Sequence, residues 1–308
     1  MTGWISGGQI ELRSEAYVAR IATVGASLRQ LRFRDRDLIV PFDTDELRPA
    51  MRGAVLAPWP NRTAAGRYGF GGAVHQLPVN EVDFGNASHG LVAWTGFDIA
   101  RSGPDSALLT ATIEPQPGYP WRLRVDVSFD LFSDGLHQRI VATNLAAEAA
   151  PFGAGSHPYL VAGLPRERAI DEWTLHLPAG KVMLTSVDRL LPTGLTDVAD
   201  QGCDFRSPRI IGGAVLNNAF TDLVRDEAGR ARVRLVDSAG VGAEVELDET
   251  CPWVQLYTAD AAAGSAHRHA LAVEPMTCPP DALNSKIDLR VIPAGESTSV
   301  RWVIRAVA

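Results

Sequence analysis

The sequence predicts an all-β protein, a large antiparallel β-sandwich built as a single domain over residues 1–308. Apolar and polar residues alternate in many short segments, which is typical of antiparallel sheets that pack on one face and leave the other in water. The 28 glycines and 20 prolines are spread along the whole chain and separate these segments. No internal repeat, low-complexity segment or long linker divides the sequence.

Individual strands follow from the alternation. The clearest hairpin joins residues Trp121–Leu131 to Leu136–Ile140 through a turn at Ser133–Gly135. Further segments that predict strands are Leu31–Arg34, Arg232–Val236, Glu244–Asp248 and Ser299–Ile304, of which the second and third form another hairpin around Asp237–Gly240. One short helix is expected near Ala259–Gly264.

Composition excludes several classes of protein. The net charge of −7 and the lack of a Lys/Arg-rich run indicate no nucleic-acid partner. No apolar run reaches the roughly 20 residues that a membrane-spanning helix needs. The cysteines, Cys203, Cys251 and Cys278, are too few and too far apart for a disulfide framework or a zinc site. With no signal peptide visible at the first residues, we expect reduced thiols in a cytoplasmic protein.

Glu274 is the strongest candidate for a catalytic group. It follows the apolar run Ala270–Val273 and precedes a segment with three prolines, so a strand that ends at Glu274 and enters a rigid turn would hold the carboxylate in place. Asp281 and Asn284 are expected to support this turn with Asx-type hydrogen bonds. The alternative is a structural carboxylate that caps a turn or pairs with an arginine.

Two histidines lie in similar small, turn-like segments. His89 precedes Gly90, and His157 precedes Pro158 and Tyr159. Either could be a proton donor or acceptor, or a structural hydrogen-bonding residue. The other histidines give weaker signals: three lie in strand-like patterns (His75, His137 and His176), and the pair His267 and His269 has no third ligand nearby, so no metal site is expected.

Polar and aromatic residues elsewhere suit a sugar. Arg62 follows a Pro-rich segment, on a loop or strand end, and its five N–H donors fit a ligand with several oxygens. Alternation places Trp253, Gln255 and Tyr257 on one face of a strand, where they could stack on and hydrogen-bond a sugar. A surface ion pair for Arg62 and a packed sheet face for the others are the plain alternatives.

Taken in order, these segments resemble the aldose 1-epimerase (galactose mutarotase-like) family. The matching pieces are Asn61-Arg62, His89-Gly90, His157-Pro-Tyr159, Gln255-Leu-Tyr257 and Glu274-Pro through Asp281-Ala-Leu-Asn284, and they run over nearly the whole chain. The resemblance implies a sandwich of the galactose mutarotase type with an open sugar cleft. It also implies a small-molecule sugar as partner, no cofactor, and a monomer or homodimer.

The resemblance also implies roles. Glu274 matches the general base, His157 the general acid, and Arg62 and His89 residues that hold sugar oxygens. One position departs: Asn217 lies where the family usually carries an aspartate. The loss of a charged acceptor predicts weaker binding or a shifted sugar preference, unless Asp222 takes its place.

The expected reaction is opening and reclosure of an aldose ring, with Glu274 ionised and His157 protonated in the productive state. Three alternatives stay open. A hexose-6-phosphate mutarotase would need a cluster of cations at the cleft, and only Arg62 is visible. A glycoside hydrolase or lyase would need a second catalytic carboxylate, and none is apparent. A non-catalytic sugar sensor would keep the fold and lose the chemistry.

Overall fold

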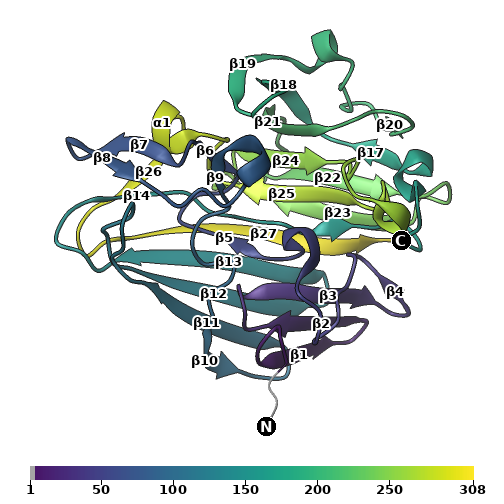
Figure 1. Cartoon of the computed structure of the whole chain (residues 1–308). Helices are drawn as coiled ribbons and strands as arrows, with labels where there is room; N and C mark the ends of the chain where they lie inside the picture. The colour runs from purple at the N-terminus through teal and green to yellow at the C-terminus, as the bar shows by residue number, and fades with distance from the viewer. Residues whose placement is uncertain (1–3) are drawn as a thin grey trace.

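The computed structural model describes residues 4–308, and nearly all of its regular structure is antiparallel strand. The largest sheet has nine strands in the order β10-β11-β12-β13-β27-β23-β22-β17-β20 (Figure 1). Their bounds are β10 Asp98–Ser102, β11 Ser106–Ile113, β12 Leu123–Phe132, β13 Gly135–Asn144, β27 Ser297–Val307, β23 Gly242–Leu247, β22 Ala231–Val236, β17 Thr174–His176 and β20 Arg209–Ile210. The last strand of the chain, β27, therefore lies in the middle of this sheet.

A second sheet of eight strands carries the cleft described below. Its order is β19-β18-β21-β24-β25-β15-β5, with β16 paired to β25 off this path. The bounds are β19 Pro192–Asp197, β18 Ala179–Thr185, β21 Asn217–Leu223, β24 Trp253–Tyr257, β25 Leu271–Met276, β15 Gly155–Ser156, β5 Val55–Leu56 and β16 Tyr159–Leu160.

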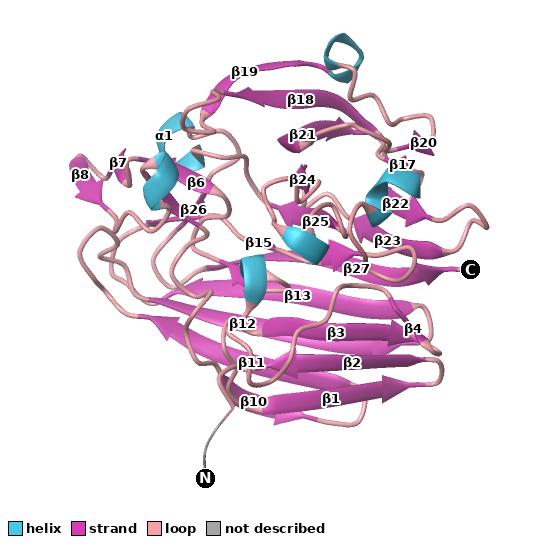
Figure 2. Ribbon diagram, turned by 45° about the vertical axis from the view of Figure 1, so that its right-hand side comes forward, coloured by secondary structure: helices cyan, strands magenta, loops and turns pink. Residues whose placement is uncertain are grey.

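The remaining strands form one sheet of four and three small pairs. The four-stranded sheet consists of β1 (Gln9–Ser14), β2 (Tyr17–Ala22), β3 (Ser27–Phe33) and β4 (Arg36–Asp37), and it packs on β11 and β12 (Figure 2). The pairs are β6 (Arg62–Ala64) with β9 (Asn86–Ser88), β7 (Arg67–Phe70) with β8 (Ala73–Gln76), and β14 (Ala150–Phe152) with β26 (Arg290–Ile292). One α-helical turn, α1 (Ala282–Ser285), follows β25.

The alternation in the sequence is the cause of this layering. In β12 the residues Leu123, Val125, Val127, Phe129 and Leu131 are buried and the residues between them are not. They join a core cluster that extends from the first strands to β27. The hairpin to β13 turns at Ser133 and Asp134, between the paired residues Phe132 and Gly135. The predicted all-β class and antiparallel sheets are confirmed.

Two local predictions need correction. The helix expected near Ala259–Gly264 is absent, and a turn followed by a 3-10 turn at Gly264–Ala266 takes its place. The strand carrying Glu274 does not end there but runs on to Met276, with Pro275 paired opposite Val254. A proline fits this position because β25 keeps extended geometry there, in which its fixed φ is allowed.

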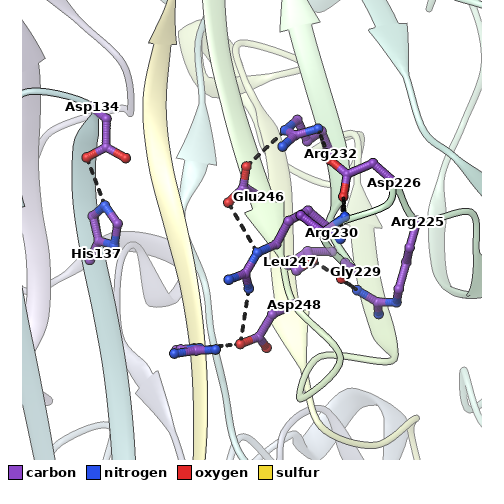
Figure 3. Close-up of polar contacts among 12 residues, drawn as sticks. Asp134, His137, Arg225, Asp226, Gly229, Arg230, Arg232, Glu246, Leu247 and Asp248 are labelled. Carbon is purple, nitrogen blue, oxygen red and sulfur yellow. Dashed lines mark hydrogen bonds and ion pairs between the residues drawn. The ribbon is translucent and has the colours of Figure 1, made fainter.

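The solvent face of the nine-stranded sheet carries a ladder of ion pairs. Three buried carboxylates alternate along β23 and its end, Glu244, Glu246 and Asp248. Arginines from the neighbouring strands and turns cover them. Arg232 binds Glu246 at 2.9 Å, and Arg230 lies 3.4 Å from Asp248 (Figure 3). Arg234 binds Glu244 at 2.6 Å, Arg305 binds Glu246 at 2.8 Å, and Arg301 pairs with Asp248.

The three cysteines are free and buried. Burial raises the thiol pKa of Cys203 and of Cys251, and raises that of Cys278 to about 12. Among residues 4–308, no helix is long and apolar enough to cross a bilayer.

Candidate active site

Seven residues singled out in the sequence line one cleft of about 300 Å³. They are Arg62, His89, His157, Asn217, Gln255, Tyr257 and Glu274. They come from β6, the segments after β9 and β15, and the strands β21, β24 and β25. Asp222 does not belong to this group, because it is exposed near the other end of β21, with its carboxylate beside the backbone of Gly180.

Strand pairing explains why the residues of the eight-stranded sheet meet. Gln255 lies opposite Glu274, and Tyr257 lies opposite both Asn217 and Ala272. Residues opposite one another in antiparallel strands point to the same face, about 4.5–5.5 Å apart.

The centre of the cleft is a pair formed by His157 and Glu274. The His157 Nε2 atom lies 3.3 Å from Oε1 of Glu274, and both side chains are almost fully buried. His157 is held by its backbone, whose N–H donates to Ala54 and whose carbonyl accepts from Gly53. The pair thus joins a strand of the sheet to the segment that leaves β15, with little freedom in either backbone.

Burial decides the charge state of this pair. It raises the pKa of Glu274 to about 8, against a smaller opposing effect of Arg62, and it lowers the pKa of His157 to about 4. Loss of water around each group is the largest cause of its shift. Burial therefore favours the neutral pair over the ionised Glu274 and protonated His157 expected in the productive state.

Aromatic rings fix the plane of His157. Tyr159 stacks on it with ring centroids 5.1 Å apart and an interplanar angle of 20°, and His89 meets it edge-on at 5.4 Å. Burial lowers the pKa of His89 well below the ordinary value, so this ring is neutral. Tyr159 belongs to one of the sequence motifs, but no pattern in the sequence predicts that its ring stacks on His157.

His89 itself has a left-handed backbone, with φ of 64°. The next residue, Gly90, also has a positive φ, and a Cβ atom there would lie 2.1 Å from the carbonyl oxygen of Ala57. Only glycine allows this close approach. Four more residues that line the cleft have positive φ: Ala50, Met51, Asn61 and Leu190. Such strain is concentrated at functional sites in many proteins.

Arg62 lies at the start of β6, as predicted, and pairs with a residue that the sequence did not indicate. Its Nε and Nη2 atoms donate to the two carboxylate oxygens of Glu81 at 2.8 and 2.7 Å. Glu81 lines the cleft, so the cleft holds a second carboxylate besides Glu274, and this one is bound to Arg62. The loop carrying Glu81 has no alternation or motif that could have pointed to it.

Asn217 and Gln255 bind one another across the strands. The Gln255 Nε2 group donates to Oδ1 of Asn217 at 3.0 Å. This contact orients both amides on the cleft wall. Asn217 thus keeps the place in the cleft that the sequence predicted, as a neutral polar group.

The proline-containing loop after β25 is anchored as expected. Oδ1 of Asp281 accepts hydrogen bonds from the backbone N–H of Ala64 and from the side chain of Asn284, at 2.9 and 2.7 Å. The Asp281 N–H donates to the carbonyl of Arg62. The loop therefore connects the strand of Glu274 to the strand of Arg62.

Several buried polar atoms of the cleft have no hydrogen-bond partner in the described structure. They are Nδ1 of His89 and of His157, Oε1 of Gln255 and Oε2 of Glu274. An unpaired buried polar group costs about 1–3 kcal/mol. A ligand rich in hydroxyl groups could satisfy such atoms, because each hydroxyl both donates and accepts.

A second hollow, of about 290 Å³, lies over the ion-pair ladder of the nine-stranded sheet. Its buried carboxylates, Glu246 and Asp248, are both neutralised by arginines. We therefore assign this hollow to the structural ladder and place the chemistry at the cleft.

An antiparallel sandwich with this cleft is the fold of the galactose mutarotase-like enzymes, which are isomerases. The chain belongs to the aldose 1-epimerase family: its sequence matches the family model over residues 8–305. The resemblance noted in the sequence is thereby confirmed.

Individual relatives agree with this assignment. The chain is 35% identical to the uncharacterized protein YihR of Escherichia coli K12, over 94% of this chain and 91% of that protein. It is 29% identical to galactose mutarotase of Mus musculus, over 82% and 78% of the two chains. Among solved structures, the aldose epimerase homologue from C. elegans superposes with a TM-score of 0.84 at 21% identity, covering 98% of this chain and 99% of that one.

Proposed function

We propose that this enzyme interconverts the α and β anomers of a free aldose, such as galactose or glucose, by opening the ring and reclosing it. The observation that carries the proposal is the buried contact of 3.3 Å between His157 and Glu274 in a polar cleft. Family membership gives the class of reaction, and the mouse relative is a galactose mutarotase.

Ring opening moves two protons. Glu274 takes the proton of the C1 hydroxyl, and His157 gives a proton to the ring oxygen, so that the C1–O5 bond breaks and an aldehyde forms. Rotation about C1–C2 presents the other face of the aldehyde. In reclosure, His157 takes the proton of the O5 hydroxyl as O5 attacks C1, and Glu274 returns a proton to O1, so that the pair ends as it began.

The proton count of the pair fits this cycle. The ionised pair and the neutral pair each hold one proton, and ring opening converts the first into the second. Burial favours the neutral pair, which is the form that recloses the ring. The charge of Arg62 lowers the pKa of Glu274, and hydroxyl groups that donate to the carboxylate would act in the same direction.

The other cleft residues hold the sugar in this proposal. Arg62 and His89 bind sugar oxygens, Asn217 and Gln255 meet hydroxyl groups, and the Tyr257 ring contacts the apolar face of the sugar. Arg62 is the only Lys or Arg among the described residues that line the cleft, which favours an uncharged sugar over a hexose 6-phosphate. Glu81 is tied to Arg62, so it is not free to act as the acid of a glycoside hydrolase.

The test is anomer exchange of glucose and galactose, followed by NMR or polarimetry with the spontaneous rate subtracted. Glu274→Ala and His157→Ala should each lower kcat by about 10²–10⁴-fold, because each removes one positioned proton-transfer group. His137→Ala is a matched control, since His137 is half-exposed on the other sheet and, among residues 4–308, forms an ion pair with Asp134 alone. Wild-type rates in both cleft variants would overturn the proposal.

A further inference from the structure

The pair formed by Arg62 and Glu81 has an effect on specificity that neither residue would have alone. Arg62 has five N–H groups. Two of them donate to Glu81 and a third donates to Oδ1 of Asn61 at 3.3 Å. Two N–H groups therefore stay available to a ligand, on a side chain that is 12% exposed.

Glu81 is held firmly in this position. Its backbone N–H and carbonyl pair with Asn86 in a short antiparallel bridge, at 3.1 and 3.2 Å. Its neighbour Asn80 binds the backbone of Ser88 through both side-chain groups. The carboxylate side chain is 22% exposed, so it faces the cleft together with the guanidinium.

Arg62 is fixed from a second side as well. Its guanidinium lies over the ring of Phe84, 5.6 Å from the ring centroid. Phe84 belongs to the 3-10 turn Val82–Phe84, which directly follows Glu81. One short segment thus supplies both the carboxylate that neutralises Arg62 and the ring on which it rests.

The charge balance of the cleft follows from these contacts. Among the described residues that line it, Arg62 is the only arginine or lysine, and burial keeps both histidines neutral. Glu81 cancels the single fixed cation. An anionic ligand could accept hydrogen bonds from Arg62 but would gain no net electrostatic attraction. The attraction to Arg62 is offset by repulsion from Glu81 a few ångströms away.

We propose that Glu81 is a specificity-determining residue, which holds the net charge of the Arg62–Glu81 pair at zero so that the cleft accepts neutral sugars and rejects anionic ones. The inference deepens the proposed function and rests on it for the identity of the substrate. The charge claim itself, however, can be tested by anion binding without any turnover.

The first experiment measures binding of inorganic phosphate to Glu81→Gln and to the wild type, by calorimetry and by ³¹P NMR. Glutamine keeps the size and one acceptor oxygen but removes the charge. Phosphate affinity of the cleft should rise on the order of tenfold, because a partly buried charge acts more strongly than an exposed one. The gain should shrink as salt is added.

Glu114→Gln is the matched control. Glu114 pairs with Arg122 at 2.9 Å on the exposed surface, with both side chains more than half exposed. The substitution makes the same change in net charge away from the cleft, so phosphate affinity should stay at the wild-type value. An equal gain in both variants would assign the effect to overall charge and overturn the proposal.

The second experiment compares substrates. In Glu81→Gln the ratio of kcat/KM for glucose 6-phosphate over glucose should rise about tenfold, by the same argument. The reciprocal variant Arg62→Gln leaves Glu81 without its cation, and the ratio for protonated glucosamine over glucose should rise instead. This second variant keeps the proposal testable if Glu81→Gln fails to fold.

The possible outcomes distinguish failure of the proposed function from failure of the specificity role of Glu81. If the wild type exchanges no anomers while Glu81→Gln gains phosphate affinity, the proposed function fails and the role of Glu81 in charge balance stands. If Glu81→Gln loses activity without gaining phosphate affinity or a changed substrate ratio, Glu81 only supports Arg62 structurally, and the specificity proposal is wrong.

Discussion

At the scale of single residues, the pair of His157 and Glu274 controls how the rate depends on pH. With the pKa of His157 at about 4 and that of Glu274 at about 8, the pair holds one proton between those values. We expect kcat/KM to be level between about pH 4 and 8 and to fall outside this range, as the pair gains a second proton or loses its only one. A single transition near the ordinary histidine pKa would contradict this expectation.

Glu274 also carries a stability cost that depends on pH. Its pKa is raised in the folded state, so the unfolded chain releases this proton first, and stability falls as pH rises from about 4.5 through about 8. Glu274→Gln removes the titration. The variant should be nearly inactive, yet its free energy of unfolding should be larger by roughly 1–3 kcal/mol at pH 8, with a smaller gain at pH 5.

Urea unfolding at the two pH values measures this difference, with Glu114→Gln as the control at an exposed site. A gain that is equal at pH 5 and pH 8 would mean that Glu274 is not buried as a neutral acid.

Residue identity was only partly sufficient to predict the cleft. Glu274 and His157 could be predicted as site residues because prolines and small residues mark their segments. The family resemblance then assigned them to one site. Glu81 could not be predicted, because its loop has no periodic pattern and its role arises only when β6 and β9 pair. The preference of His157 and Glu274 for the neutral form could not be predicted either, because it depends on burial, which is a property of the folded molecule.

At the scale of elements, the ladder on β23 stabilises the centre of the large sheet. Burial opposes ionisation of Asp248, but hydrogen bonds from Thr250 and Arg301 outweigh it and lower its pKa. Asp248→Asn should reduce the free energy of unfolding by about 1–3 kcal/mol at pH 7, because it leaves buried donors without a charged acceptor. The difference should shrink as pH falls below about 4, where the unfolded chain binds the proton first, and should be lost once the pH passes the lowered pKa of the native carboxylate.

Activity should be unchanged in Asp248→Asn, since the residue lies on the solvent face of the other sheet. Asp134→Asn is the control, because Asp134 is exposed and pairs only with His137 (Figure 3). Equal stability of the two variants would show that the ladder contributes no more than a surface pair.

The strands were predictable where one face is buried and the other faces solvent. β12, β13 and β22 fit that condition, whereas β23 alternates in sequence although all six of its residues are buried. Short strands such as β5 and β15 could not be predicted, because all of their residues are buried and no alternation marks them. The helix expected near Ala259–Gly264 failed for a related reason: small residues at helical spacing have no apolar face to bury.

At the scale of the whole molecule, the last strand of the chain completes the middle of the largest sheet. β27 pairs with β13 on one side and β23 on the other, and it buries Val300, Trp302 and Ile304. Burial of each such side chain contributes about 1.5–3 kcal/mol, against a total stability of about 5–15 kcal/mol for a typical protein. A chain that ends at Glu296 should not fold.

Far- and near-UV circular dichroism with urea titration measures this outcome. The control lacks only Ala308, which lies beyond the end of β27. Cooperative unfolding of the chain that ends at Glu296 would show that the two halves of the sheet hold together without β27. No local pattern could have predicted this central place for the strand, because the pairing joins residues far apart in the sequence.

The buried thiols allow local opening of the folded protein to be measured by labelling. Thiolates react and thiols do not, and Cys251 and Cys278 are both fully buried with raised pKa values. A thiol reagent added to the native protein would therefore react with either of these two cysteines only after the structure around it opens. The two labelling rates would compare how often the end of the β23 ladder and the loop beside the cleft come apart, without any introduced probe.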